Sequence, residues 1–289
     1  MQAINVDRLK QHVYMLAEEI GEHNIYHPAA LRASAAYITH QWQDQGYYVT
    51  PQTYTVNGLQ CANLEITRRG NGATDDCIVI GAHYDSVAGS PGANDNGSGI
   101  AALLELSRLF TNIESNTSVR FVAFVNEEPP FFYGNNMGSM IYAKRARQQQ
   151  DKIRFMISLE TIGYYLELPN SQHYPPLLKY FYPRTGNFVA FVSNFSSRGV
   201  MHNAVKRYRL SSDFPVEHIA TLSIVPGVSW SDHLSFWREG YKAFMITDTA
   251  LYRYPYYHTT QDSADKLTYE PYAKMVNGLF MMLQTLANQ

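Results

Sequence analysis

The sequence has few cysteines and little net charge, and both features exclude classes of protein. It contains two cysteines, Cys61 and Cys77, without the CxxC spacing of a zinc–thiolate site. They fall on neighbouring predicted strands, and we interpret them as buried free thiols, with a cross-strand disulfide as the alternative. A formal net charge of −2 gives no electrostatic basis for binding nucleic acid or an anionic membrane.

Signals for a membrane protein and for a serine hydrolase are also missing. No stretch approaches the roughly 18 consecutive apolar residues of a membrane span. Residues 1–7 have neither the basic nor the apolar region of a signal peptide, so we expect a cytoplasmic protein with no membrane partner. The GxSxG segment of many serine hydrolases does not occur, which disfavours that mechanism.

What the sequence does contain is three short apolar runs that each lead to side chains able to bind divalent metal. The runs are residues 77–82, 119–125 and 153–159, and they lead to His83, to Glu127 and Glu128, and to Glu160. Runs of this length and composition predict buried strands of a parallel sheet. Because ligands of open α/β sheets bind beyond the carboxyl ends of the strands, we expect a site at that edge.

The remaining patterns indicate one α/β domain over residues 1–289. Helical periodicity covers residues 5–20, 28–45, 100–110, 136–149, 196–208 and 264–287, and further strands are predicted at 47–56, 63–67, 188–192 and 241–247. Residues 164–230 are rich in Tyr, Pro and Ser. We interpret them as an irregular insertion over the active-site edge, where substrate specificity often resides.

Single residues of the predicted site have ordinary structural explanations, but their combination favours a metallohydrolase. His83 and Asp85 have the spacing of a metal-bound imidazole oriented by a carboxylate. Asp95 lies on a Gly/Asn loop before a helix, where an N-cap is the ordinary role. The two adjacent glutamates repel each other unless metal holds one while the other acts as a base. For a further ligand, His233 and His258 are both candidates on residue type alone.

Four segments resemble, in order and spacing, the motifs of the M28 zinc aminopeptidases. They are GAHYDSVAGSPGANDNGSG (81–99), FVNEE (124–128), SDHLSFW (231–237) and YHTTQDS (257–263). The resemblance extends from about residue 78 to residue 267 and implies an enzyme with two zinc ions. It also implies a three-layer α/β/α fold around a central twisted, mostly parallel mixed sheet.

The resemblance implies a set of metal ligands by position. Asp95 matches the carboxylate that both zinc ions share. His83 and Glu160 would complete one zinc site, and Glu128 and His258 would complete the other.

The resemblance also implies residues that act beside the metal. Glu127 matches the general base that takes a proton from the zinc-activated water. Asp85 and Asp232 match carboxylates that support the histidine ligands, which makes His258 the favoured ligand of the two histidine candidates. Tyr257 falls near a position that stabilises the oxyanion in some relatives.

Two positions depart from the usual motif. Many M28 members have Asp where this chain has Glu160, which changes the reach of that carboxylate. The bridging aspartate is usually followed by a second Asp, whereas Asn96 follows Asp95 here. Because the corresponding peptide bond is commonly cis in the family, we predict a cis bond between Asp95 and Asn96.

The implied substrate is a peptide with a free amino terminus, and the sequence predicts no oligomeric state. Aromatic residues at 131–133 and 252–257 predict a pocket for an apolar N-terminal side chain. One alternative is a glutaminyl cyclase with a single zinc, because residues 129–137 make the link between the two glutamates and the following helix unusually long. A second alternative is a catalytically silent binding module on the same fold.

Overall fold

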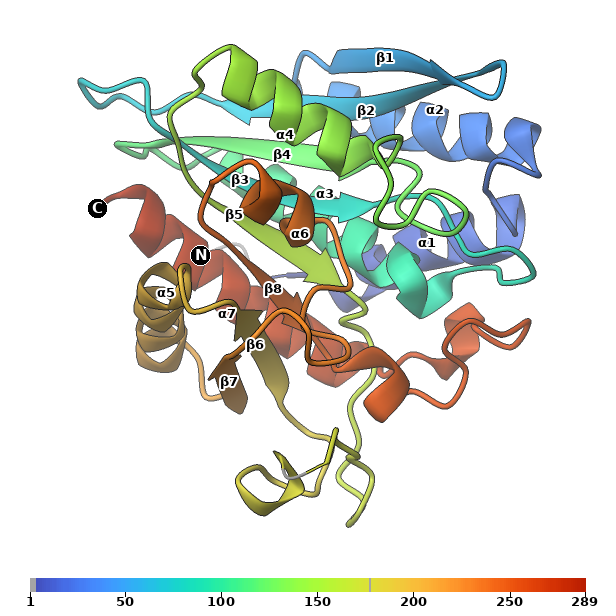
Figure 1. Ribbon diagram of the computed structural model, residues 1–289, viewed down its shortest axis with the longest axis vertical. Helices are drawn as coiled ribbons and strands as arrows, with labels where there is room; N and C mark the ends of the chain where they lie inside the picture. Colours follow the sequence, from blue (N-terminus) through green and yellow to red (C-terminus); the bar gives the residue numbers. More distant parts are fainter. Residues whose placement is uncertain (1–3, 177) are drawn as a thin grey trace.

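The computed structural model describes residues 4–176 and 178–289, and a single mixed sheet organises them (Figure 1). Its strands are β1 (Thr50–Val56), β2 (Leu59–Arg68), β3 (Cys77–His83), β4 (Ser118–Phe124), β5 (Ile153–Glu160), β6 (Val189–Ser193), β7 (Val216–Ala220) and β8 (Ala243–Thr247). Their order across the sheet is β1-β2-β4-β3-β5-β8-β6-β7.

The four central strands run parallel, and both margins contain antiparallel pairs. Strands β4, β3, β5 and β8 pair in parallel, while β2 is antiparallel to β4 and β1 is antiparallel to β2. On the other side, β6 is antiparallel to β8 and parallel to β7. Every residue of β3 is buried, as expected for a central strand covered on both faces. The carboxyl ends of β3, β4 and β5 therefore meet at one edge of the sheet.

Helices cover both faces of the sheet, which gives the three-layer α/β/α fold that the motifs implied (Figure 1). The helices are α1 (Val6–Tyr14), α2 (Pro28–Asp44), α3 (Gly99–Phe110), α4 (Gly138–Gln148), α5 (Arg198–Ser211), α6 (His233–Arg238) and α7 (Tyr269–Ala287). Residues of α1, α2, α3, α5 and α7 belong to one hydrophobic cluster, whereas α4 and α6 pack on the opposite face. No helix within the described residues is both long and apolar enough to cross a bilayer.

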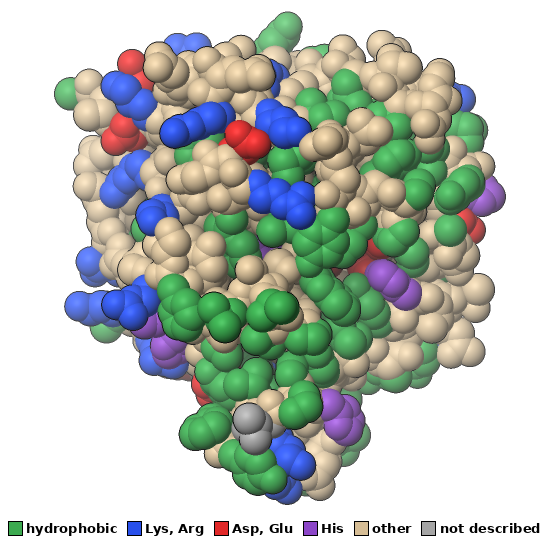
Figure 2. Space-filling view, in the orientation of Figure 1, with side chains coloured by type: hydrophobic (Ala, Val, Ile, Leu, Met, Phe, Trp, Pro, Cys, Tyr) green, Lys and Arg blue, Asp and Glu red, His purple; other side chains and the backbone are tan. Residues whose placement is uncertain are grey.

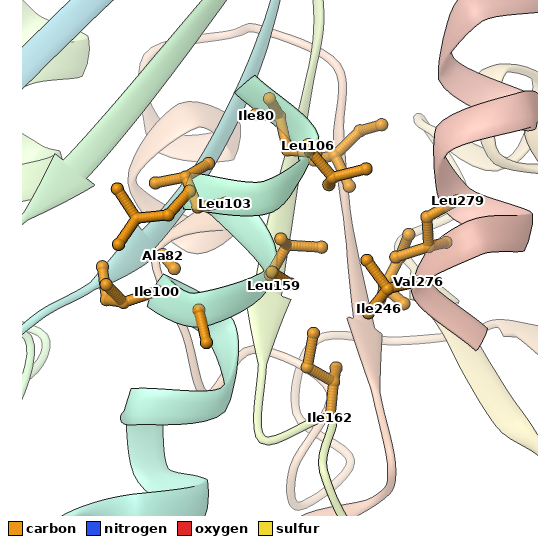
Figure 3. Close-up of a cluster of buried hydrophobic side chains, with 14 of the residues drawn as sticks. Ile80, Ala82, Ile100, Leu103, Leu106, Leu159, Ile162, Ile246, Val276 and Leu279 are labelled. Carbon is orange, nitrogen blue, oxygen red and sulfur yellow. The ribbon is translucent and has the colours of Figure 1, made fainter. Parts of the chain in front are cut away.

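The larger core lies between the central strands and helices α3 and α7 (Figure 3). Ile80, Leu159 and Ile246 from the strands face aliphatic side chains such as Leu103 of α3 and Leu279 of α7, and all five are fully or almost fully buried. Burying a side chain of this size contributes about 1.5–3 kcal/mol. This packing fixes the strands whose ends carry the predicted site.

Several boundaries differ from the sequence prediction. Helix α1 ends at Tyr14 and continues as the π-helical turn Met15–Ile20. Helix α7 begins at Tyr269, after a separate 3-10 turn at Ala264–Lys266. Strand β7 and helix α6 were not predicted, because Glu217 and His218 interrupt the apolar pattern of β7 and because α6 has only six residues.

The segment 164–230 contains both regular elements and loops. Residues 189–220 contribute β6, α5 and β7 to the main layers, which differs from a purely irregular insertion. The described residues of 164–176 and 178–188 form loops and the short turn Leu178–Tyr180, and they extend beyond the β6 and β7 side of the sheet (Figure 1). Elsewhere, Cys61 and Cys77 are buried free thiols, as the sequence analysis favoured.

Candidate metal centre

The structure brings all five predicted ligands together at the carboxyl edge of the sheet. His83 and Glu160 are the last residues of β3 and β5, and Glu128 lies in the turn after β4. Asp95 comes from the buried turn Ala93–Ser98 that precedes α3, and His258 from the loop between β8 and α7.

Asp95 lies at the centre of this cluster, with one carboxylate oxygen facing each histidine. Its Oδ1 atom lies 3.3 Å from Nε2 of His83, and its Oδ2 atom lies 3.0 Å from Nε2 of His258. Glu160 approaches the same His83 nitrogen at 3.3 Å, and Glu128 approaches the His258 nitrogen at 3.6 Å. Two groups of three potential ligands share Asp95, and a third group combines His83 and Glu128 with Glu127.

Several carboxylate oxygens of the cluster lack hydrogen bonds, as expected for atoms that bind divalent cations. Both oxygens of Asp95 and Oε1 of Glu128 are buried and accept no hydrogen bond from the part of the chain that the structure describes. Buried carboxylates without a partner are costly, and a bound cation removes that cost. Imidazole nitrogens with carboxylate oxygens form a donor set that zinc accepts.

The pKa values of the cluster reflect the same excess of negative charge. Burial raises the pKa of Glu128 well above its usual range, and the carboxylates of Asp95 and Glu127 raise it further. For His83, burial acts to lower the pKa, but Glu160 and Asp95 outweigh burial and raise it well above the usual value.

Glu127 lies beside the two groups that share Asp95, and its carboxylate is almost completely buried. Its Oε2 atom is 4.0 Å from Nε2 of His83, further than the oxygens of Asp95 and Glu160. Burial raises the pKa of Glu127 well above its usual range, and Glu160 adds to this effect. A raised pKa suits a carboxylate that accepts and returns a proton near neutral pH.

Asp85 supports the site differently from the sequence prediction. Nδ1 of His83 donates to the main-chain carbonyl of Asp85 at 2.9 Å, whereas the nearest carboxylate oxygen is 3.7 Å away. This bond leaves Nε2 of His83 free to face the carboxylates of the cluster. The carboxylate of Asp85 instead accepts the main-chain N–H groups of Glu127 and Glu128, each at 3.1 Å. Asp85 therefore fixes both adjacent glutamates.

Asp232 and His233 lie next to the site, without contacting the histidine ligands by hydrogen bonds. Both carboxylate oxygens of Asp232 are buried and unpaired within the described chain, and burial raises its pKa to about 7. The expected bond from Asp232 to a histidine ligand is not formed. Nε2 of His233 donates to the carbonyl of Val228 at 2.8 Å, and His233 belongs to neither ligand group.

Asp262 is a site-forming residue to which sequence reasoning gave no role. Its carboxylate accepts the N–H of Asn94 at 2.8 Å, the N–H of Asp95 at 3.1 Å and the hydroxyl of Tyr254 at 2.7 Å. Because Asp262 follows His258 by four residues, it connects the loops that carry two of the ligands. Its place in the YHTTQDS motif was the signal that could have identified it.

The peptide bond between Asp95 and Asn96 is cis, as predicted. The side chain of Asn96 donates to the carbonyl of Leu159 at 2.9 Å and accepts from the N–H groups of Gly99 and Thr161. An ionised Asp has no hydrogen to donate to Leu159, which explains why Asn suits this position.

Glu160 and Tyr257 complete the walls of the site. An oxygen of Glu160 accepts the hydroxyl of Ser231 at 2.8 Å, which orients this longer carboxylate toward His83. The ring of Tyr257 stacks on the ring of His258, with centroids 3.9 Å apart.

Two connected hollows open at this edge. The acidic hollow is lined by Asp95, Glu127, Glu128, Pro129, Phe132, Glu160, Trp230, Tyr257 and His258. A second hollow is largely apolar and shares Glu160, Trp230 and Tyr257 with the first. Figure 2 shows hydrophobic side chains gathered over the part of this face where Figure 1 places β6, β7 and residues 164–188.

Comparison with known proteins identifies the family. The family described as Peptidase family M28 matches residues 63–283. YfbL of Escherichia coli K12, an uncharacterized protein, is 36% identical over 286 residues, which cover 96% of this chain and 87% of YfbL. The chain belongs to peptidase family M28.

A curated aminopeptidase is among the relatives of this M28 peptidase. Leucine aminopeptidase 1 of Ajellomyces capsulatus (strain H88) is 27% identical over 225 residues, which cover 72% of this chain and 53% of the relative. The M28 chain therefore spans about half the length of that enzyme.

Solved structures establish that this M28 peptidase shares its fold with two kinds of enzyme. BSAP, a zinc aminopeptidase from Bacillus subtilis, has a TM-score of 0.79 at 14% identity and covers 100% of this chain and 96% of its own. A glutaminyl cyclase from Fimbriiglobus ruber has a TM-score of 0.70 at 18% identity and covers 98% of this chain and 97% of its own.

Proposed function

We propose that the chain is an aminopeptidase that uses two zinc ions to hydrolyse the N-terminal residue of peptides. The observation that carries this proposal is the position of Asp95 between two histidines, with both carboxylate oxygens buried and unpaired within the described chain. The two oxygens face different histidines, so an ion held with His83 would leave the oxygen beside His258 without a metal. A second ion, held with His258, would use that oxygen as well.

The two groups of side chains supply three protein ligands for each zinc ion. His83, Asp95 and Glu160 would hold one ion, and Asp95, Glu128 and His258 would hold the other. When bound, zinc polarises a carbonyl group and lowers the pKa of water toward about 7.

Glu127 is the residue best placed to transfer protons in the reaction. Its carboxylate lines the acidic hollow and is held in place by the bond from its own N–H to Asp85. We assign it the role of general base, which accepts the proton of the attacking water and then delivers it to the leaving amine. Tyr257 lines the same hollow, and we assign its hydroxyl to stabilise the oxyanion.

The shape and charge of the two hollows support a substrate with a free amino terminus. The carboxylates of the acidic hollow attract an ammonium group. The connected apolar hollow offers space for the N-terminal side chain. Of the aromatic residues from which the sequence predicted such a pocket, Tyr252 and Tyr257 line the apolar hollow and Phe132 lines the acidic one.

One experiment separates this proposal from the cyclase alternative. The zinc-loaded protein is incubated with two peptides that differ only in an N-terminal Leu or Gln, and the products are analysed by mass spectrometry. The proposal predicts release of free N-terminal residue from the Leu peptide. Formation of a pyroglutamyl peptide from the Gln peptide, without any release of Leu, would instead establish cyclase activity. No conversion of either peptide, or of a matching peptide with an N-terminal Lys, would favour a silent binding module.

A further inference from the structure

An unpaired carboxylate lies on the wall of the apolar hollow, away from the metal centre. It belongs to Glu217 on the edge strand β7. Glu217 is paired with Ala190 of the neighbouring strand β6. Ala190 lines the hollow, and paired residues of parallel strands point to the same face of the sheet. The residues that flank Glu217 point to the other face, where His218 contacts His202 of α5. Glu217 therefore points into the hollow.

Among the described residues of the lining, no Lys or Arg balances the charge of Glu217. Glu217 and Glu160 are its acidic residues, and its histidines are His173 and His218. Burial and Arg209 lower the pKa of His218, which disfavours its cationic form. The hydroxyls of Tyr174 and Tyr182 donate to the carbonyls of Pro183 and His218, so neither hydroxyl donates to Glu217. Burial raises the pKa of Glu217, and Arg209 only partly opposes this effect. A partly desolvated carboxylate in this setting favours binding of a cation.

The path from the metal centre to Glu217 is long and apolar. It begins at Glu160 on β5 and crosses β8 and β6, where Met245, Val192 and Ala190 line the hollow. Neighbouring strands are about 4.8 Å apart, so β7 lies roughly 14 Å from β5 along the sheet. A substrate side chain that extends from the metal centre toward Glu217 must therefore be long. Lys and Arg have long aliphatic stems that pack on apolar surface while a charge remains at the tip.

We propose that Glu217 makes the apolar hollow a binding site for the side chain of an N-terminal Lys or Arg. The aliphatic stem lies against β8 and β6, and the terminal cation pairs with the Glu217 carboxylate. This inference rests on the proposed aminopeptidase function and defines its substrate class. It refines the expectation of an apolar N-terminal residue, because the walls of the hollow are apolar and its far side is acidic.

The test compares two substrates that differ only in the terminal charge. Lysyl and norleucyl anilides have the same four-carbon stem, and only lysine has an ammonium group. We measure the ratio of their kcat/KM values for the zinc-loaded wild type, for Glu217→Gln and for the control Glu114→Gln. Glu114 is an exposed glutamate outside the lining of both hollows, so its substitution makes the same charge change elsewhere.

The lysyl-to-norleucyl ratio should fall roughly tenfold in Glu217→Gln, between the effects of an exposed and a buried ion pair. Most of the change should be a higher KM for the lysyl substrate, because the contact is made in both ground and transition states. The ratio should not change in Glu114→Gln. An unchanged ratio in Glu217→Gln, including equal losses on both substrates, overturns the inference. If wild type turns over neither anilide, the aminopeptidase proposal itself fails.

Discussion

The bonds from the Asp95 loop to Asp262 predict that Asp262→Asn loses both stability and zinc affinity. In the wild type, this carboxylate accepts the N–H groups of Asn94 and Asp95 and the hydroxyl of Tyr254. Asparagine keeps one acceptor oxygen but turns an NH₂ group toward a buried N–H. A buried donor left without an acceptor costs about 1–3 kcal/mol, so the free energy of unfolding should fall by about 2 kcal/mol.

Zinc affinity should fall because the same loop carries the carboxylate placed between the two histidines. Loss of a residue that orients metal ligands typically weakens metal binding roughly 10- to 100-fold. Affinity is measured by competition with a chelator, and stability by urea unfolding of the metal-free protein. The control Tyr254→Phe removes only the hydroxyl bond to Asp262, so it should lose about 1 kcal/mol and keep its zinc affinity.

The two readouts distinguish positioning from simple stabilisation. If Asp262→Asn is destabilised but binds zinc as tightly as the wild type, Asp262 has a structural role alone. If neither quantity changes, the bonds at 2.8 and 3.1 Å do not hold the Asp95 loop, and the reasoning is refuted.

Two further predictions concern Glu127 and His233. Glu127→Gln should lower peptide turnover roughly 10²- to 10⁴-fold without changing the zinc content. Initial rates measure the turnover, and elemental analysis measures the zinc. Near-normal turnover would show that Glu127 is not the base. Burial lowers the pKa of His233 to about 4 from a usual 6.5. The unfolded chain therefore takes up a proton at a higher pH than the folded protein does. The contribution of His233 to the free energy of unfolding is present above pH 6.5 and is lost as the pH falls toward 4. The metal-free protein should therefore lose about 2 kcal/mol from this residue between pH 7 and pH 5 by urea unfolding. His233→Gln should show a smaller loss over that interval, and an equal loss would contradict the assignment.

The positions of the strand ends were predictable from sequence because the signal is local. Apolar runs that stop at His83 and Glu160 mark both the buried strand and the edge where it ends. Parallel strands place their carboxyl ends at the same edge of the sheet, so no further information was needed to predict that these residues lie together. The cis bond at Asp95 and Asn96 followed from family resemblance and not from the chemistry of the residues.

The supporting contacts were not predictable from spacing. The positive φ of Asn126, 61°, turns the chain after β4 so that the N–H groups of Glu127 and Glu128 both reach the carboxylate of Asp85. His83 donates instead to the main-chain carbonyl of Asp85. The bond from Asp95 to Asp262 joins residues 167 positions apart, a distance over which local patterns contain no information.

The short elements were missed for a similar reason. Strand β7 is a five-residue edge strand in which Glu217 and His218 interrupt the apolar pattern. Pairing with β6 determines its conformation, and this pairing directs Glu217 into the hollow. The inference about cationic substrates therefore depended on the strand pairing seen in the structure.

Zinc content per chain tests the central claim most directly. The full chain is saturated with zinc, dialysed to remove loose ions and analysed for zinc and protein by elemental and amino-acid analysis. The position of Asp95 between His83 and His258 predicts two zinc ions per chain. One zinc ion per chain, or none, would contradict the two-metal aminopeptidase.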